Sequence, residues 1–253
     1  MDASVLNFYD TLAEDYDLLF INWRESVISQ GKILDTVITQ ELRKKTVSIL
    51  DCSCGIGTQA IGLANCGHTM AAFDLSPLAI ERAKKEAKML GVSIDFKVDD
   101  FCKMENVKDC FDAALSCDNA VPHLLHDDDL HLMLANMWRV LNPGGLLLLS
   151  IRDYDQIRKN RPKATEPRFL DGNRITFQIW EWEKAGNVYE VNQFIMKCIE
   201  GQWLTTCAKT KYRALLRHEL TTSLAKAGFS GVKWLMPEQS EYYQPIVLAR
   251  KFL

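Results

Sequence analysis

A glycine-bearing turn and an aspartate are the residues whose types and spacing most clearly indicate ligand chemistry in this chain. The turn reads Cys54-Gly55-Ile56-Gly57-Thr58-Gln59, and Asp74 follows it after a helical pattern and a short apolar run. Glycine has no Cβ, so the backbone can turn tightly there and approach a ligand closely. A carboxylate about 20 residues beyond such a turn accepts hydrogen bonds from ribose hydroxyls in nucleotide-binding folds. The spacing therefore predicts that Asp74 binds a ribose.

The glycine turn alone leaves the ligand open. Its G-x-G-x-x-A pattern also fits a nicotinamide-dependent dehydrogenase, and a tight turn without any ligand is a further interpretation. Cys52 and Cys54 lie in the same turn, but a zinc site would need a second pair or a nearby histidine at suitable spacing, and none is evident. No metal is predicted, and the two thiols are interpreted as small side chains lining the turn.

Two further groups of polar side chains follow predicted strands. Asp100 and Phe101 come after the run 92–98, where a carboxylate can accept from the exocyclic amine of adenine while the ring packs on the base. A surface turn is the alternative. The cluster from Cys117 to His123 follows the run 111–116, and open α/β sheets bind ligands beyond the carboxyl ends of their strands.

Short apolar runs alternate with helical patterns, which is typical of a βαβ arrangement that would position these side chains. The expected strands are 47–50, 70–73, 92–98, 111–116 and 146–151, with helices beginning near residues 58, 76 and 127. Residues 156–170 are expected to form a loop. The extended runs 174–183, 188–197 and 202–213 interrupt the alternation, so they predict an inserted antiparallel sheet. After a helix over 215–227, the runs 232–236 and 245–251 predict an edge hairpin.

Two helices, 6–20 and 23–42, are expected before the first strand. They form either a packing cover or a lid to which Tyr16 and Trp23 contribute aromatic faces, and both interpretations stay open. The predicted segments are an N-terminal helical cover or lid (1–45), a cofactor-binding core (46–155), an inserted antiparallel substrate or lid sheet (156–214) and the end of the core (215–253).

The composition is that of an ordinary globular protein, with 253 residues, of which 47% are hydrophobic and 25% charged. The net charge of −3 gives no attraction to polyanions, so nucleic acid is not an expected partner. No apolar run approaches the roughly 20 residues of a membrane span. Eight scattered cysteines and an N-terminus without the features of a secretory signal predict reduced thiols and a cytoplasmic location. The oligomeric state is left open.

The order of these features resembles the Rossmann-like S-adenosylmethionine-dependent methyltransferases over residues 47–251. The turn Pro143-Gly144-Gly145 before an apolar strand and the closing hairpin are not expected of a nicotinamide dehydrogenase. A finer similarity points to the glycine and sarcosine N-methyltransferases. It is carried by Cys54-Gly55-Ile56-Gly57-Thr58-Gln59, Asp118-Asn119 with His123, Arg152-Asp153-Tyr154-Asp155, Tyr9-Asp10-x-Leu12-Ala13-x-x-Tyr16-Asp17 and Tyr242-Tyr243-Gln244-Pro245.

The resemblance implies an α/β fold with a Rossmann-like seven-stranded, mostly parallel sheet, a C-terminal antiparallel hairpin and an inserted small antiparallel β-sheet. It implies S-adenosyl-L-methionine as cofactor, S-adenosyl-L-homocysteine as product, and methyl transfer to the amine of a small amino acid such as glycine, sarcosine or dimethylglycine. Alternatives are another acceptor, whether metabolite, RNA or protein, a nicotinamide-dependent oxidoreductase, or a binding module that has kept the fold without chemistry.

The resemblance also assigns residues. Asp74 would hold the ribose diol, Gly55 and Gly57 would line the methionine end of the cofactor, and Arg152 would pair with the substrate carboxylate. The implied cofactor-binding set is Tyr16, Trp23, Cys54, Gly55, Gly57, Asp74, Asp100, Phe101, Cys117 and His123. The implied substrate-binding set is Asn119, Arg152 and Tyr243, of which Asn119 and Arg152 are the implied catalytic residues.

Non-functional alternatives remain for three of these residues. Arg152 could form a structural ion pair with Asp153 or Asp155, His123 could be a core histidine, and Asn119 could be a turn residue.

Overall fold

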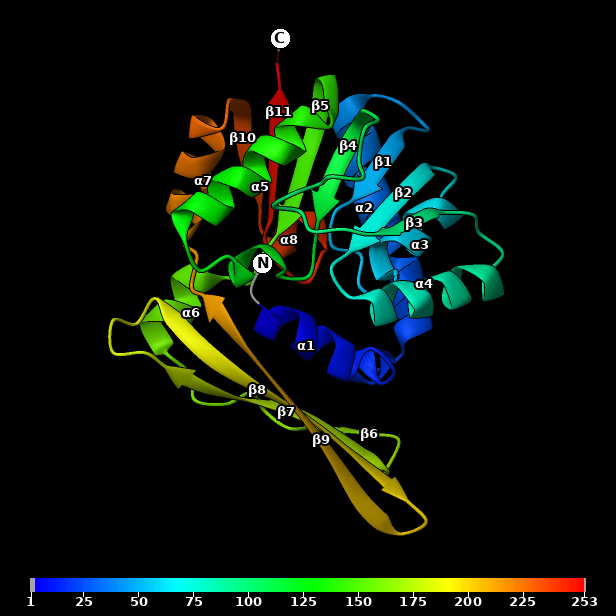
Figure 1. The fold of residues 1–253 in the computed structure, drawn as a ribbon, viewed down its shortest axis with the longest axis vertical. Coiled ribbons are helices and arrows are strands. Elements are labelled where there is room, and N and C mark those ends of the chain that lie inside the picture. Colours follow the sequence, from blue (N-terminus) through cyan, green and yellow to red (C-terminus); the bar gives the residue numbers. More distant parts are fainter. Residues whose placement is uncertain (1–2, 253) are drawn as a thin grey trace.

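The computed structural model describes residues 3–252 and contains two separate β-sheets (Figure 1). The larger has seven strands in the order β10-β11-β5-β4-β1-β2-β3. Its strands are β1 Ser48–Asp51, β2 Thr69–Asp74, β3 Asp95–Val98, β4 Phe111–Ser116, β5 Leu141–Ser150, β10 Phe229–Leu235 and β11 Ile246–Lys251. Strand β11 is antiparallel to both β5 and β10, whereas the pairs β1–β2, β1–β4, β2–β3 and β4–β5 are parallel. The predicted mostly parallel sheet with a closing hairpin is confirmed.

Helices cover both faces of this sheet, as Figure 1 shows. One face carries α2 Trp23–Leu42, α3 Thr58–Asn65 and α4 Pro77–Met89, and the other carries α5 Asp127–Arg139 and α7 Arg217–Lys226. Side chains alternate along a strand, so β5 serves both cores. Leu146 and Leu148 pack with the α2 and α3 side, whereas Leu147 and Leu149 pack with the α5 and α7 side.

Local sequence explains where these helices begin and how closely they approach. Ser76 caps α4 because its hydroxyl accepts from the backbone N–H of Ala79 at 3.0 Å, and Pro77 occupies the first turn. Helices α2 and α3 cross through Gly31 and Gly62, where a Cβ added to Gly31 would lie 2.5 Å from the backbone of Gly62. Only glycine permits that approach, which sets α2 behind the glycine turn.

The smaller sheet is antiparallel, with the order β6-β7-β8-β9. Its strands are β6 Arg168–Leu170, β7 Arg174–Trp182, β8 Val188–Ile199 and β9 Gln202–Arg213. It lies beyond the carboxyl ends of the parallel strands, and helix α1 Ala3–Leu12 runs between the two sheets (Figure 1). Phe8 and Leu12 of α1 pack on Ile195 and Ala208 of this sheet. The predicted inserted sheet is confirmed. Helix α1 of the N-terminal segment fills the space between this sheet and the larger one.

The expectation of a loop over 156–170 is wrong in two places. Helix α6 Tyr154–Asn160 begins the segment, and β6 ends it. Asp153 caps α6 through the backbone N–H of Gln156, and the ring of Tyr154 is fully buried. The segment is polar and α6 buries only Tyr154, so the sequence carries no helical pattern of apolar residues there.

Smaller differences lie elsewhere. The turn Asn142-Pro143-Gly144-Gly145 belongs to β5, the predicted helix 6–20 divides into α1 and the short η1 Tyr16–Leu19, and a single turn, α8 Pro237–Ser240, separates β10 from β11. Residues 1, 2 and 253, at the outer ends of the predicted 1–45 and 215–253 segments, lie outside the described residues. Between residues 3 and 252, the helices are too short or too polar to cross a bilayer.

Candidate active site

Two adjoining cavities lie at the carboxyl ends of β1, β2, β4 and β5. The glycine-loop pocket has a free volume of about 50 Å³ and is lined by Val5, Tyr9, Tyr16, Cys52, Ser53, Cys54, Gly55, Ile56, Thr58, Gln59, Asp74, Leu75, Asp99, Phe101, Cys117, Asp118, Ala120 and His123. The intersheet cavity, of about 780 Å³, lies between the two sheets and is lined by Arg152, Asp118 and Tyr243 among others. Tyr16 and Asp118 line both.

The glycine turn and Asp74 form one hydrogen-bonded unit. Gly55 and Gly57 have φ values of +53° and +93°, a region that side chains disfavour. The carboxylate of Asp74 accepts from the backbone N–H of Gly55 at 2.8 Å and from that of Ser76 at 2.9 Å. A carboxylate offers about four acceptor positions, so Asp74 keeps room to accept from a ribose hydroxyl. Burial raises the pKa of Asp74, and the backbone N–H groups of Ser76, Gly55 and Leu75 oppose that shift.

Phe101 lines the pocket with Asp99, and Asp100 does not. The carboxylate of Asp100 instead accepts from the backbone N–H of Cys102 at 2.9 Å, within the turn. Asp99 accepts from the N–H groups of Asp100 and Asn106, and it points at the pocket from the end of β3. An acid and a ring therefore meet at the pocket, but the acid is Asp99, one residue before the predicted Asp100.

Trp23 lies behind the glycine turn and not in the pocket. Its indole N–H donates to the hydroxyl of Thr58 at 2.8 Å, and its ring is buried in the core under α2. Gly57 is likewise in the turn without lining the pocket. Cys54 and Cys117 do line it, with burial raising the pKa of both thiols, which keeps them protonated and unreactive.

Helix α1 and η1 form one wall of the glycine-loop pocket through Val5, Tyr9 and Tyr16. The hydroxyl of Tyr9 lies 2.8 Å from Nε2 of His123, and Nδ1 of His123 lies 3.2 Å from the carbonyl oxygen of Lys211. A carbonyl only accepts, so Nδ1 carries the proton and Nε2 accepts from Tyr9. Burial lowers the pKa of His123 to about 3, so the ring is neutral at pH 7. His123 is thus both a pocket-lining residue and the contact that ties the N-terminal cover to the sheet.

The side chains of Asp118 and Asn119, in the turn after β4, point in different directions. Asn119 is buried, lines neither cavity, and accepts from the backbone N–H of Arg152 at 3.1 Å through Oδ1. Asp118 lines both cavities, and its Oδ1 accepts from the hydroxyl of Tyr243 at 2.5 Å. The resemblance implies a role for Asn119 and none for Asp118, because the pattern contains both residues and does not show which side chain points outward.

Arg152 presents a half-buried cation to the intersheet cavity. Its guanidinium carbon lies 5.1 Å from the ring centroid of Trp180 and 5.2 Å from that of Tyr212. Its nitrogens donate to the hydroxyl of Tyr189 at 3.1 Å and, more weakly, to Oε1 of Gln178 at 3.4 Å. All four contacts are neutral, so the positive charge of Arg152 has no ion-pair partner among residues 3–252.

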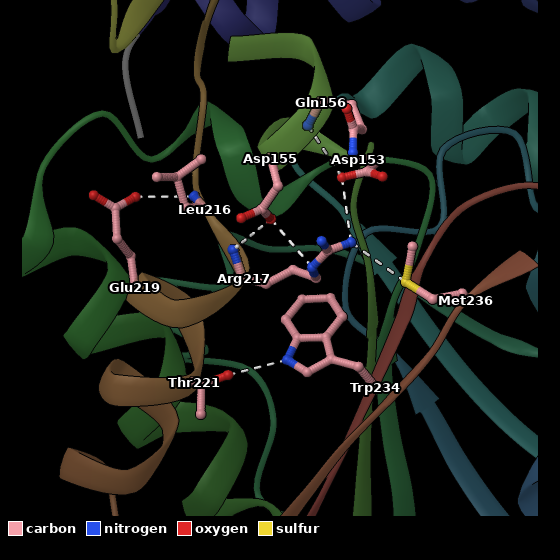
Figure 2. A network of polar contacts seen from close by, with 9 residues as sticks. All are labelled: Asp153, Asp155, Gln156, Leu216, Arg217, Glu219, Thr221, Trp234 and Met236. Atoms are coloured by element: carbon pink, nitrogen blue, oxygen red, sulfur yellow. Dashed lines mark hydrogen bonds and ion pairs between the residues drawn. The ribbon is translucent and has the colours of Figure 1, made fainter. Parts of the chain in front are cut away.

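The nearest acids in the sequence pair elsewhere, which makes the alternative of a structural ion pair with Arg152 wrong. Figure 2 shows Asp153 and Asp155 turned toward Arg217 at the start of α7. Arg217 lies 3.3 Å from Asp153 and 3.1 Å from Asp155. Arg217 also contacts Met236, so these two acids fasten α6 and α7 to the end of β10. The guanidinium of Arg152 therefore faces the intersheet cavity without an ion pair to either acid.

Comparison with known proteins decides the family. A methyltransferase-domain family model matches residues 49–145, the segment that holds the glycine turn, Asp74 and Asp118. The chain is 25% identical over 203 residues to a glycine/sarcosine N-methyltransferase of Aphanothece halophytica, which covers 75% of this chain and 74% of that protein. The solved methyltransferase of Clostridium acetobutylicum has the same fold, with a TM-score of 0.76 at 14% identity over 96% of this chain and 98% of the other.

The chain is an S-adenosylmethionine-dependent methyltransferase.

The relatives of the methyltransferase do not all share one acceptor. A glycine/sarcosine N-methyltransferase of Halorhodospira halochloris is 28% identical over 67% of this chain and 62% of its own length. A tRNA 5-carboxymethoxyuridine methyltransferase of Escherichia coli (strain K12) is 29% identical over 70% of this chain and 74% of that protein. The family therefore does not by itself identify the acceptor of this enzyme.

The pocket residues fit S-adenosylmethionine. A Cβ built on Gly55 would meet no atom within 4 Å, so the turn leaves open space on the side of the pocket that it lines. Asp74 offers spare acceptor positions for a ribose, and the ring of Phe101 offers an apolar surface for a base. When bound, the cofactor supplies a sulfonium methyl group that is already electrophilic. The remaining task of the protein is to bring an acceptor to it in line.

Proposed function

We propose that the methyltransferase transfers a methyl group to the amine of a small acceptor that carries a carboxylate, an amino acid such as glycine, sarcosine or dimethylglycine. The observation that carries this proposal is the half-buried guanidinium of Arg152, which faces the intersheet cavity and whose contacts among residues 3–252 are all neutral. A charge that is withdrawn from water is costly unless it is paired. An anionic acceptor would complete the site.

The surroundings of Arg152 favour a carboxylate in particular. A guanidinium forms two parallel hydrogen bonds with a carboxylate, which fixes direction as well as position. The rings of Trp180 and Tyr212, 5.1 Å and 5.2 Å away, hold the guanidinium in place. Alignment of reactants can supply roughly 7–11 kcal/mol of a barrier, so orientation by Arg152 is a large share of what the reaction needs.

We further propose that the predicted segment 1–45 acts as a lid. Val5, Tyr9 and Tyr16 line the glycine-loop pocket, so α1 and η1 cover the space that a nucleoside would occupy. We expect α1 to move aside when the cofactor enters. Once the helix has returned, the Tyr9–His123 contact would exclude water from the reacting atoms. The remaining predicted segments, a core over 46–155 and 215–253 and a substrate sheet over 156–214, are proposed with it.

The size of the intersheet cavity favours a second candidate, a larger acceptor. About 780 Å³ lies within the range of roughly 300–1,000 Å³ that holds drug-sized ligands, which is generous for glycine. A nucleoside or sugar bearing an acidic group would also satisfy Arg152. The net charge of −3 disfavours a long polyanion such as tRNA.

An acceptor screen with methyl-labelled S-adenosylmethionine tests the proposal. Sarcosine and sarcosinamide form the decisive pair, because the amide has nearly the same shape without the negative charge. We expect label transfer to sarcosine, glycine or dimethylglycine and far slower transfer to sarcosinamide. Equal rates for sarcosine and sarcosinamide would remove the role of Arg152. Transfer only to RNA or to an amino sugar would replace the proposal with the second candidate or another acceptor.

A further inference from the structure

Asp118 stands where the two cavities join. Among residues 3–252 it is the carboxylate that lines both the glycine-loop pocket and the intersheet cavity. A methyl donor held in the first and an acceptor held in the second must meet at this junction. The acid is therefore placed next to the reacting atoms, although the sequence pattern gave it no role.

The backbone around Asp118 is held in an unfavourable conformation. Asp118 and Asn119 have φ values of +57° and +68°, consecutive left-handed residues that carry side chains. Such conformations persist where the surroundings enforce them, and they concentrate at functional sites. Here the N–H of Asp118 donates to the hydroxyl of Ser150 at 2.9 Å, and the N–H of Asn119 donates to the carbonyl of Ser150 at 3.2 Å.

The same turn fixes Asp118 relative to Arg152. Oδ1 of Asn119 accepts from the backbone N–H of Arg152 at 3.1 Å, so the segments that carry Asp118 and Arg152 are joined directly. Both side chains line the intersheet cavity. Arg168, Asp153, Glu238 and Glu241 line the cavity as well, but Arg152 and Asp118 are the two charges that this turn joins. The pair is complementary to a zwitterion, whose carboxylate meets Arg152 and whose ammonium meets Asp118.

Asp118 retains capacity for that ammonium. A carboxylate offers about four acceptor positions, and the hydroxyl of Tyr243 uses one of them at 2.5 Å. The same hydroxyl holds the carboxylate at the junction, which makes Tyr243 a positioning residue.

We propose that Asp118 binds the ammonium group of the acceptor and takes its proton before methyl transfer, an inference that rests on the amino-acid acceptor proposed above. One N–H bond of the ammonium breaks, and the proton goes to the carboxylate of Asp118. The freed lone pair forms the N–C bond with the methyl carbon, and the C–S bond breaks with its electron pair left on sulfur. The products are the methylated ammonium, S-adenosylhomocysteine and a protonated Asp118, which releases its proton to water.

The groups around Asp118 suit this role. Asp118 shares the lining of the intersheet cavity with Arg152, Tyr16, Tyr212, Tyr242 and Tyr243, and that of the glycine-loop pocket with Tyr9 and Cys117. Burial raises the pKa of Asp118, while Tyr243, Arg152 and Tyr16 act to lower it. A carboxyl whose pKa is raised is a better proton acceptor near neutral pH than an exposed one.

The test compares Asp118→Asn with Asp128→Asn, an identical change at an exposed position in the first turn of α5. kcat/KM for sarcosine is measured across pH with saturating S-adenosylmethionine, and S-adenosylhomocysteine affinity is measured by calorimetry. We expect Asp118→Asn to lose at least about 100-fold at pH 7, to recover at high pH where free sarcosine is already neutral, and to bind S-adenosylhomocysteine within about twofold of wild type. Asp128→Asn should match wild type.

Tyr243→Phe supplies a readout that a purely structural role would not move. The hydroxyl of Tyr243 lowers the pKa of Asp118, so its loss should shift the acidic limb of the pH profile to higher pH. An Asp118→Asn enzyme with the wild-type pH profile would overturn the inference and leave the acceptor proposal intact. A loss confined to S-adenosylhomocysteine affinity would assign Asp118 to the ammonium of the cofactor instead and also overturn it. A wild-type enzyme that methylates no amino acid would overturn both proposals.

Discussion

Replacing Arg152 with lysine separates charge from geometry in the intersheet cavity. Lysine keeps the positive charge but has a compact ammonium that cannot form two parallel hydrogen bonds or lie flat against the rings of Trp180 and Tyr212. If Arg152 only neutralised charge, the variant would behave almost as wild type. If its fork orients a carboxylate, acceptor turnover should suffer while the cofactor is bound normally.

The expected loss follows from one missing charge-assisted hydrogen bond. A hydrogen bond to a charged group contributes about 1.5–3 kcal/mol, and about 1.4 kcal/mol corresponds to a tenfold change. Arg152→Lys should therefore lower kcat/KM for sarcosine by roughly 10- to 100-fold. Most of the change should appear in KM, because the carboxylate is held in the ground state as well as the transition state. Arg152 lines the intersheet cavity and not the glycine-loop pocket, so S-adenosylhomocysteine affinity should hardly change.

Steady-state kinetics and calorimetry measure the two quantities on the same preparation, and a thermal melt checks folding. Arg168→Lys is the matched control, because Arg168 is an exposed arginine of β6 that lines the same cavity. Exposed charges contribute about 0–1 kcal/mol, so this variant should lose less than about fivefold. An Arg152→Lys enzyme with unchanged sarcosine kinetics, or with equal losses for sarcosine and S-adenosylhomocysteine, would refute the reasoning.

Three other perturbations test the cofactor half and the scaffold. Asp74→Ala should weaken S-adenosylhomocysteine binding in calorimetry by at least about tenfold, because a charged acceptor of the pocket is lost, and unchanged affinity would contradict the role of Asp74. Burial raises the pKa of Asp51 to about 8, so between roughly pH 4 and pH 8 the folded protein keeps a proton that the unfolded chain releases, and stability falls as pH rises through that window. Asp51→Asn cannot titrate, so in urea unfolding its stability relative to wild type should rise from pH 5 to pH 8 and then level off; a constant difference would contradict the burial argument. Gly62→Ala should destabilise the fold by about 1–3 kcal/mol or more, since the added Cβ would lie 2.4 Å from the carbonyl oxygen of Val27, and an unchanged melting temperature would show that α2 can move away.

The parallel core was predictable because its signals are local. The apolar run before Asp51, the glycines at 55 and 57, and Asp74 at the next strand end all lie within one βαβ unit. Strand β4 matches its predicted bounds at both ends, and the hairpin signal between β7 and β8 predicted the second sheet. In each case short-range pattern and backbone chemistry agree with the tertiary structure, so little information from distant residues was needed.

The predicted site residue and the residue that lines the cavity differ by one position in two turns. Asp99 lines the pocket and Asp100 does not, and Asp118 lines both cavities while Asn119 is turned inward. Neighbouring residues in a turn point in different directions that depend on φ and ψ, and the sequence pattern does not encode those angles. Trp23 was placed in the lid for its aromatic ring, but its N–H bond to Thr58 makes it a support for the glycine turn.

The acceptor side could not be assembled from the sequence because its parts come from distant segments. Arg152 follows β5, while Gln178 and Tyr212, which contact it, belong to β7 and β9 of the second sheet. The sequence indicates that an arginine follows a buried strand, but not that Asp153 and Asp155 are taken by Arg217 (Figure 2). That pairing leaves Arg152 as a half-buried charge without an ion-pair partner among residues 3–252. The charge that the cavity offers to an acceptor thus depends on which acids are paired with other side chains as much as on which groups line the cavity.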